Sequence, residues 1–284
     1  MTAAGAPAAV WVNGRPAEAV APTERGLHYG DGLFETIACI GGRPRFLALH
    51  LERLAHGCAR LGIEFPAREE LWPEILALAA DAPRAIVKVL LTRGPAAARG
   101  YATTGAERPT RVTLRYPWEE EAAHPAAAGV RVRTAALRLG ENPALAGLKH
   151  LNRLEQVLAR REWSGGDIAE ALMFSSSGRL ISGVMSNVFL VADGRLRTPL
   201  LDRCGVAGVM RQVVLREAAR AGIAAEEAAL DAADLAGARE LFLTSAVIGL
   251  HPVRALDGRA CEIGPVTREL QRRLTPLLAQ ATDG

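Results

Sequence analysis

Only two of the 34 basic residues in this 284-residue chain are lysines, Lys88 and Lys149. The others are arginines, whose guanidinium stays protonated at any working pH, whereas a lysine amine can lose its proton and act as a nucleophile or base. A lysine retained in so arginine-rich a sequence is therefore a candidate for amine chemistry. Composition alone leaves chance retention of both lysines open as the alternative.

The surroundings of the two lysines differ. Lys149 lies in an irregular loop over 140–150 and precedes a helix predicted over 151–163, so its amine could project from a strand end into a cleft. A surface lysine at a helix start is the alternative. Lys88 lies within an apolar strand predicted over 84–94, where we expect a structural role or a place at the edge of a site.

Sequence signatures of several other chemistries are missing. The chain has no GxGxxG after a strand, no GxxxxGK[ST] and no GxSxG, and its six histidines show no HExxH or HxH spacing. We therefore expect neither a Rossmann nucleotide site nor a metal site. The net charge of +3, without a basic cluster interleaved with aromatic residues, argues against a nucleic-acid partner.

Composition indicates a globular chain that does not cross a membrane. The sequence is 49% hydrophobic and 23% charged, and its mean hydropathy is +0.10. The N-terminus lacks the basic region and the long apolar region of a secretory signal. The four cysteines are scattered without a CxxC pair, which favours reduced, mostly buried thiols and a cytoplasmic location: Cys39, Cys58, Cys204 and Cys261.

Local signals predict an N-terminal half built from strands and two helices. Asn13-Gly14 marks a type I′ hairpin turn, and apolar residues recur at helical spacing from Leu47 to Leu61, ending at Gly62. We expect a hairpin over 9–20, strands over 33–40, 84–94 and 108–117, a short return strand to Phe46, and helices over 47–63 and 69–82.

A charged and then Pro/Ala-rich stretch without periodicity separates the two halves. It predicts a small domain over 1–118, a linker over 119–128 and a larger domain over 129–284. The second half mixes strands and helices without the regular alternation of a doubly wound sheet. Its predicted elements are a strand over 129–139, hairpins at Ser177-Gly178, Asp193-Gly194 and Asp257-Gly258, and helices over 151–163, 207–222 and 266–280.

Several segments together resemble the fold type IV family of pyridoxal-phosphate enzymes. They are RGLHYGDGLFET (25–36), HLERL (50–54), LKHLNRLEQVLAR (148–160), MSNVFLV (185–191), GVAGVMR (205–211) and LTSAVIGLHPV (243–253). The family contains branched-chain and D-amino-acid aminotransferases and aminodeoxychorismate lyases, and the 148–160 segment is most similar to the lyases. The resemblance implies an α+β fold with a small N-terminal α/β domain and a larger, mixed β-barrel-like C-terminal domain.

The resemblance also implies a site for pyridoxal 5′-phosphate. Lys149 would be the catalytic amine that holds the cofactor aldehyde. Arg53 would be the cation for the phosphate, for which a surface ion pair with Glu52 or a nearby acid is the alternative. Backbone N–H groups would contribute from two turns, although each could be a plain turn: Val209 and Met210 in the first, Ser245 and Ala246 in the second.

Four further residues match positions that the family uses for substrate. Arg99 and Tyr101, in ARGYAT, match an RGY of the lyases, and an arginine fork suits a carboxylate, of which aminodeoxychorismate carries two. Tyr29 and Glu35 would lie on a strand that walls the site. The alternatives are packing for Tyr29 and a solvated charge for Glu35. The resemblance further implies a homodimer in which the RGLHYGDG or RGY loop reaches the neighbouring subunit.

One position departs from the family pattern. Ser182 stands where members place a glutamate opposite the pyridine nitrogen. A hydroxyl offers that nitrogen a neutral hydrogen bond instead of a charge partner, which weakens the ring as an electron sink. We therefore expect elimination of pyruvate from 4-amino-4-deoxychorismate, giving 4-aminobenzoate for folate biosynthesis. The alternatives are a branched-chain or D-amino-acid aminotransferase, or a protein that binds the cofactor without catalysis.

Overall fold

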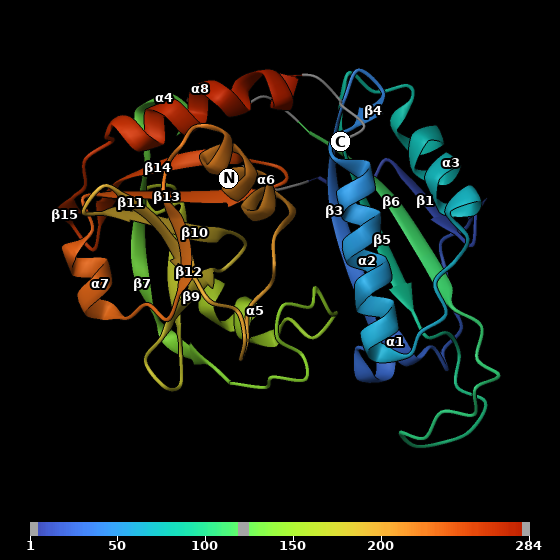
Figure 1. Cartoon of the computed structure of the whole chain (residues 1–284). Coiled ribbons are helices and arrows are strands. Elements are labelled where there is room, and N and C mark those ends of the chain that lie inside the picture. The colour runs from blue at the N-terminus through green and yellow to red at the C-terminus, as the bar shows by residue number, and fades with distance from the viewer. Residues whose placement is uncertain (1–4, 119–124, 280–284) are drawn as a thin grey trace. The chain divides into compact units, whose positions relative to one another are not determined.

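The computed structural model describes residues 5–118 and 125–279, and the chain divides into two compact units (Figure 1). The N-terminal unit comprises residues up to 118 together with Lys149–Asn152, and the C-terminal unit comprises residues 125–148 and Arg153–Leu278. The sequence placed Lys149–Asn152 in the second domain. These residues belong to the N-terminal unit because they pair with one of its strands. Positions 119–124 of the predicted linker lie outside the described residues.

An antiparallel sheet of six strands forms the centre of the N-terminal unit, in the order β2-β1-β6-β5-β3-β4. The hairpin at Asn13-Gly14 is confirmed, and φ values of 52° and 77° at these residues fit a type I′ turn. The strands are β1 (Ala9–Val12), β2 (Arg15–Pro16), β3 (Gly32–Ile40), β4 (Arg43–Pro44), β5 (Arg84–Thr92) and β6 (Thr110–Pro117).

Two helices, α2 (Leu47–Leu61) and α3 (Arg68–Ala79), pack along this sheet (Figure 1). Both were predicted. The apolar stripe of α2 is buried against β3, and α2 ends at Gly62, whose φ of 63° closes the helix. A third helix, α1 (Arg25–Tyr29), was not predicted, because five residues are too few to show a periodic pattern.

A mixed sheet of nine strands forms the C-terminal unit, in the order β12-β11-β10-β13-β14-β7-β8-β9, with β15 beside β14. The end strand β9 also lies against β10, so the sheet curls back on itself, as expected for a barrel-like domain. Its strands are β7 (Val130–Leu139), β8 (Glu170–Ser175), β9 (Leu180–Gly183), β10 (Asn187–Ala192), β11 (Arg195–Pro199), β12 (Ala225–Ala228), β13 (Glu240–Ser245), β14 (Gly249–Leu256) and β15 (Arg259–Ala260).

The three predicted hairpins of this unit are confirmed as the β8–β9, β10–β11 and β14–β15 connections. Helix α5 begins later than predicted, because residues 149–151 pair with β3 instead. None of the helices in the described ranges is long and apolar enough to span a bilayer. The helices are α4 (Pro125–Ala128), α5 (Leu154–Arg160), α6 (Val209–Arg220), α7 (Ala232–Gly237) and α8 (Pro265–Ala279).

Gly94, two residues after the end of β5, tests how tightly the start and the end of the β5–β6 loop pack together. Its φ is +102°, and a Cβ there would lie 1.9 Å from the carbonyl oxygen of Arg108. We expect Gly94→Ala to lower the free energy of unfolding by about 2 kcal/mol or more, through backbone strain and overpacking. Gly105→Ala is the matched control, because Gly105 has φ +77° but no described atom within 4 Å of a Cβ. Equal losses in the two variants on urea unfolding would contradict the packing.

Candidate active site

Glu35, His50 and Arg53 form a buried cluster between β3 and α2. The His50 Nδ1 lies 2.6 Å from Glu35 Oε2, and Arg53 donates from Nε to Oε1 at 2.8 Å and from Nη2 to Oε2. His50 and Arg53 are three residues apart and so share one face of the helix. The Glu35 side chain is only 1% exposed, so the alternative of a solvated charge is wrong. The partner of Arg53 is this carboxylate rather than Glu52.

The charges of the cluster are set by burial and by one another. Burial alone would raise the pKa of the Glu35 carboxyl, but the Arg53 guanidinium and the His50 ring lower it to about 2. Burial lowers the pKa of His50, which favours a neutral ring that donates from Nδ1 to Glu35. Glu35 is therefore an ionised acceptor with both oxygens engaged, and it fixes the orientation of Arg53.

Lys149 is held at the edge of β3 by backbone pairing. The Phe34 N–H donates to the Lys149 carbonyl at 2.9 Å, and the Leu151 N–H donates to Gly32 at 3.0 Å. The Lys149 Nζ lies 4.2 Å from the centroid of the Phe34 ring, and the Lys88 Nζ lies 5.4 Å from the same centroid. Both lysines of the chain thus lie against the same aromatic ring. Burial lowers the pKa of Lys88.

The predicted substrate residues lie at two different places. Tyr29 is the last residue of α1, not part of a strand as predicted, because Gly30 in the left-handed region (φ 62°) ends this helix before β3. Its ring centroid lies 5.2 Å from that of Tyr101, which is 83% exposed on the β5–β6 loop beside the exposed Arg99. Glu35 is buried under α2 instead, and both of its oxygens are already hydrogen-bonded to Arg53 or His50.

In the C-terminal unit, α6 begins at a buried turn that offers backbone donors. The first intrahelical bond runs from Gln212 N–H to the Gly208 carbonyl, so the N–H groups of Val209 and Met210 have no acceptor within the helix. Both residues are buried, at 4% and 1% exposure. Only glycine fits at position 208, since a Cβ would lie 2.0 Å from Asn187 Oδ1. A buried helix start of this kind suits an anion such as a phosphate.

The remaining predicted cofactor residues lie in the same unit. Ser245 ends β13, and its hydroxyl accepts the Ile248 N–H at 3.3 Å within the turn that contains Ala246. Ser182 is half-buried on β9, with Met173 of β8 as its cross-strand partner. Each predicted residue thus lies at a turn or strand position of the kind expected. Their roles toward a ligand stay predictions.

Sequence reasoning missed His50 and Arg25 as individual residues. No role was predicted for His50 from the sequence, although its spacing of three from Arg53 was a usable signal for a shared partner. Arg25 is buried at 4% and contacts the β5–β6 loop through the carbonyl of Tyr101 at 2.9 Å. No local pattern could have revealed a contact between residues 76 positions apart.

The chain is similar to known proteins over most of its length. Residues 32–256 match the amino-transferase class IV family. The aminodeoxychorismate lyase of Vibrio harveyi is 34% identical over 279 residues, which cover 93% of this chain and 98% of the relative. A putative branched-chain-amino-acid aminotransferase of Methanocaldococcus jannaschii is 30% identical over 88% of each chain. The crystal structure of 4-amino-4-deoxychorismate lyase from Pseudomonas aeruginosa superposes with a TM-score of 0.90 at 45% identity, covering 94% of this chain and 98% of that one.

Glu35→Gln tests the buried cluster. The pKa of Glu35 is lowered to about 2 in the folded protein, so its ionised form contributes stability above the ordinary carboxyl pKa and loses it as the pH falls toward 2. We expect the variant to lose about 3 kcal/mol at pH 7, because Arg53 and His50 lose a buried partner. Its stability should also fall less between pH 5 and about 2 than that of the wild type.

Urea unfolding at a series of pH values measures both effects. Glu52→Gln, an exposed change on the same helix, is the control and should leave stability within about 0.5 kcal/mol. Parallel pH profiles for Glu35→Gln and the wild type would show that the carboxylate is not paired as described.

Proposed function

This chain belongs to the class IV amino-transferase family, and from that membership we propose that it is a pyridoxal-phosphate-dependent lyase. It eliminates pyruvate from 4-amino-4-deoxychorismate and leaves 4-aminobenzoate, a precursor in folate biosynthesis. The observation that carries the proposal is the placement of Lys149 against β3 and the Phe34 ring, within the segment most similar to the lyases. The near full-length similarity to lyases of two bacteria supports the same reaction.

The donors described above fit pyridoxal 5′-phosphate. Lys149 provides the amine for the aldehyde, and Arg53 provides a cation whose orientation is fixed by Glu35. The N–H groups at the buried start of α6, which have no acceptor within the helix, suit the phosphate. The turn after β13 would add backbone donors at Ser245 and Ala246. We propose that these residues hold the cofactor and that Ser182 lies opposite its ring nitrogen.

The chemistry then follows from Lys149. When bound, the cofactor would supply an electron sink for the carbon that bears the substrate amine, and this amine would replace Lys149 on the aldehyde and leave the lysine amine free. The Lys149 amine takes that proton from the ring carbon that bears nitrogen, acting as general base. The C–O bond to the enolpyruvyl group breaks, the six-membered ring becomes aromatic, and the departing group gains a proton to give pyruvate. Lys149, now protonated, is suited to return that proton.

The exposed loop residues would bind the substrate. Arg99 offers a planar fork of donors for one of the two substrate carboxylates, and Tyr101 with Tyr29 would form an aromatic wall beside it. Glu35 acts on the other side of β3, through Arg53, and not on the substrate.

We also propose that the protein is a cytoplasmic homodimer. Leu27, in helix α1, and Tyr101, on the β5–β6 loop, lie in the two segments expected to reach the neighbouring subunit. They are 70% and 83% exposed, and such apolar surface favours burial by a second copy. All four cysteines are free thiols, as expected in a reducing compartment. Sedimentation at assay concentration checks the dimer, and an active species that stays monomeric would disprove it.

Incubation with 4-amino-4-deoxychorismate tests the reaction directly. We expect equal amounts of 4-aminobenzoate and pyruvate from the wild type and none from Lys149→Ala. Borohydride reduction of the cofactor-loaded protein, followed by peptide mapping, should place the pyridoxyl label on Lys149. Lys88→Ala is the matched control, since it removes the other lysine and should keep the label. A label on Lys88 would overturn the assignment of the catalytic amine.

Ser182→Glu tests the choice between elimination and amine transfer. With a hydroxyl beside the ring nitrogen, we expect lyase activity and only slow transfer to 2-oxoglutarate or pyruvate, because a route that ends in an aromatic ring needs a weaker electron sink. The glutamate should raise amine transfer if it pairs with the ring, and an unpaired buried carboxylate would cost several kcal/mol of stability. Ser182→Gln controls for size.

Assays of both reactions on all three proteins decide between the two functions. If the wild type transaminates branched-chain or D-amino acids faster than it forms 4-aminobenzoate, the aminotransferase alternative replaces the lyase.

A further inference from the structure

Arg25 fixes the backbone of the loop that carries Arg99 and Tyr101. Its Nη2 donates to the Tyr101 carbonyl at 2.9 Å, and its Nη1 lies 3.3 Å from the carbonyls of both Gly100 and Ala102. Three successive carbonyls therefore converge on one guanidinium that is 4% exposed. Only a planar group with five donors can serve this arrangement, because a lysine ammonium is a compact point charge.

The same guanidinium also contacts Tyr29. Its central carbon lies 5.1 Å from the Tyr29 ring centroid, and that ring lies 5.2 Å from the ring of Tyr101. Arg25 thus touches one predicted substrate residue through its ring and sets the backbone of another. Arg99 directly precedes the first anchored carbonyl, that of Gly100.

The neighbouring residue, Glu24, holds the base of the loop. Thr92, at the end of β5, and Thr110, at the start of β6, donate their hydroxyls to its two carboxylate oxygens at 2.6 and 2.8 Å. The Arg25 N–H adds a bond to the Gly94 carbonyl at 3.1 Å. Glu24 and Arg25 therefore hold the β5–β6 loop together: Glu24 bonds to both of its ends, and Arg25 bonds to its middle.

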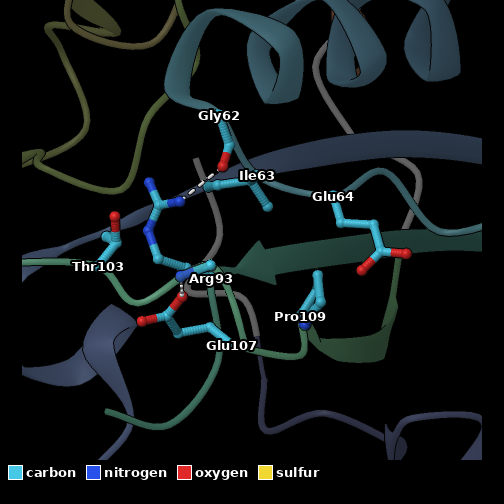
Figure 2. Close-up of a pocket in the computed structure, with 8 residues that line it drawn as sticks. Gly62, Ile63, Glu64, Arg93, Thr103, Glu107 and Pro109 are labelled. Atoms are coloured by element: carbon cyan, nitrogen blue, oxygen red, sulfur yellow. Dashed lines mark hydrogen bonds between the residues drawn. The ribbon is translucent and has the colours of Figure 1, made fainter. Parts of the chain in front are cut away.

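Asp31 links this anchor to helix α2. It accepts from Arg25 Nε at 2.8 Å and from Arg93 Nε at 2.8 Å. Arg93 in turn donates to the carbonyls of Leu61 and Gly62, at the end of α2, at 2.8 and 2.7 Å. Figure 2 shows the Arg93 side chain reaching Gly62, with Thr103 and Glu107 of the loop close by. The other end of this link is the helix that carries His50 and Arg53.

From these contacts we propose that Arg25 is a positioning residue for substrate recognition. It holds Gly100–Ala102 in one backbone conformation, so that Arg99 and Tyr101 are presented to the substrate carboxylate without further ordering. A connection longer than roughly 15 residues without helix or strand is usually functional or mobile. Ordering such a loop costs conformational entropy, and the Arg25 contacts order its backbone before the substrate binds. This inference rests on the proposed function, in which the loop binds a carboxylate.

Arg25→Lys tests the proposal because it keeps the charge beside Asp31 and loses the three-carbonyl contact. We expect KM for 4-amino-4-deoxychorismate to rise about tenfold, as for the loss of one charge-assisted contact. The kcat and the visible absorption of the bound cofactor should stay within about twofold, since neither Lys149 nor Arg53 is touched. Amide hydrogen exchange of the peptide over 98–104 should become faster.

Two further variants sharpen the test. Asp31→Asn should speed exchange both in this loop and in the last turn of α2, because Asp31 bonds to Arg25 and Arg93 alike. If Arg25→Lys does not fold, Asp31→Asn tests the same anchoring of the loop. Arg108→Gln is the matched control: it removes an arginine near the end of the same loop, where an 82% exposed side chain meets Glu64 at 3.4 Å. It should change neither KM nor exchange over 98–104.

The outcomes distinguish a failure of the proposed role of Arg25 from a failure of the proposed lyase function. A looser loop with unchanged KM, a fall in kcat alone, or exchange as slow as in the wild type would each overturn the role of Arg25. If the wild type forms no 4-aminobenzoate, the proposed function fails instead, and hydrogen exchange still decides whether Arg25 anchors the loop.

Discussion

The pleat of strand β3 is the constraint on which the N-terminal unit's functional residues depend. Successive residues of a strand point to opposite faces of the sheet. Glu35 consequently faces α2, where it holds Arg53, while the adjacent Phe34 lies on the other face beneath Lys149 and Lys88. A shift of one residue in the register of β3 would exchange these two faces and separate the predicted phosphate cation from its carboxylate.

Buried and partly buried carboxylates connect segments that are distant in sequence. Glu24 joins the ends of β5 and β6, and Asp31 joins α1 to the end of α2. Glu74 accepts a hydroxyl from Thr113 of β6 and pairs with Arg111 at 3.2 Å. Such pairs add little net stability compared with apolar packing, but an unpaired partner is costly. These pairs therefore raise the free energy of alternative arrangements, in which a partner is left unpaired, more than they lower the free energy of the native one.

The sequence predicted features that depend on neighbouring residues and missed those that depend on distant ones. The turns at Asn13-Gly14 and Asp193-Gly194 and the length of α2 follow from local backbone preferences, and Lys149 could be singled out from composition. The pairing of Lys149–Asn152 with β3 could not be predicted, because a helical pattern over 151–163 obscured it. Contacts such as that of Arg25 with the Tyr101 carbonyl need the folded chain to bring the two together.

The scarcity of lysine has a practical consequence for probing this protein. Both lysines are half-buried and lie against the same Phe34 ring, so reagents that acylate amines have no fully exposed lysine target in the folded chain. A protease that cuts after lysine has only these two places to act, and the fragments would be residues 1–88, 89–149 and 150–284. The rate at which such fragments form would therefore measure how often the surroundings of the Phe34 ring open, without any engineered label.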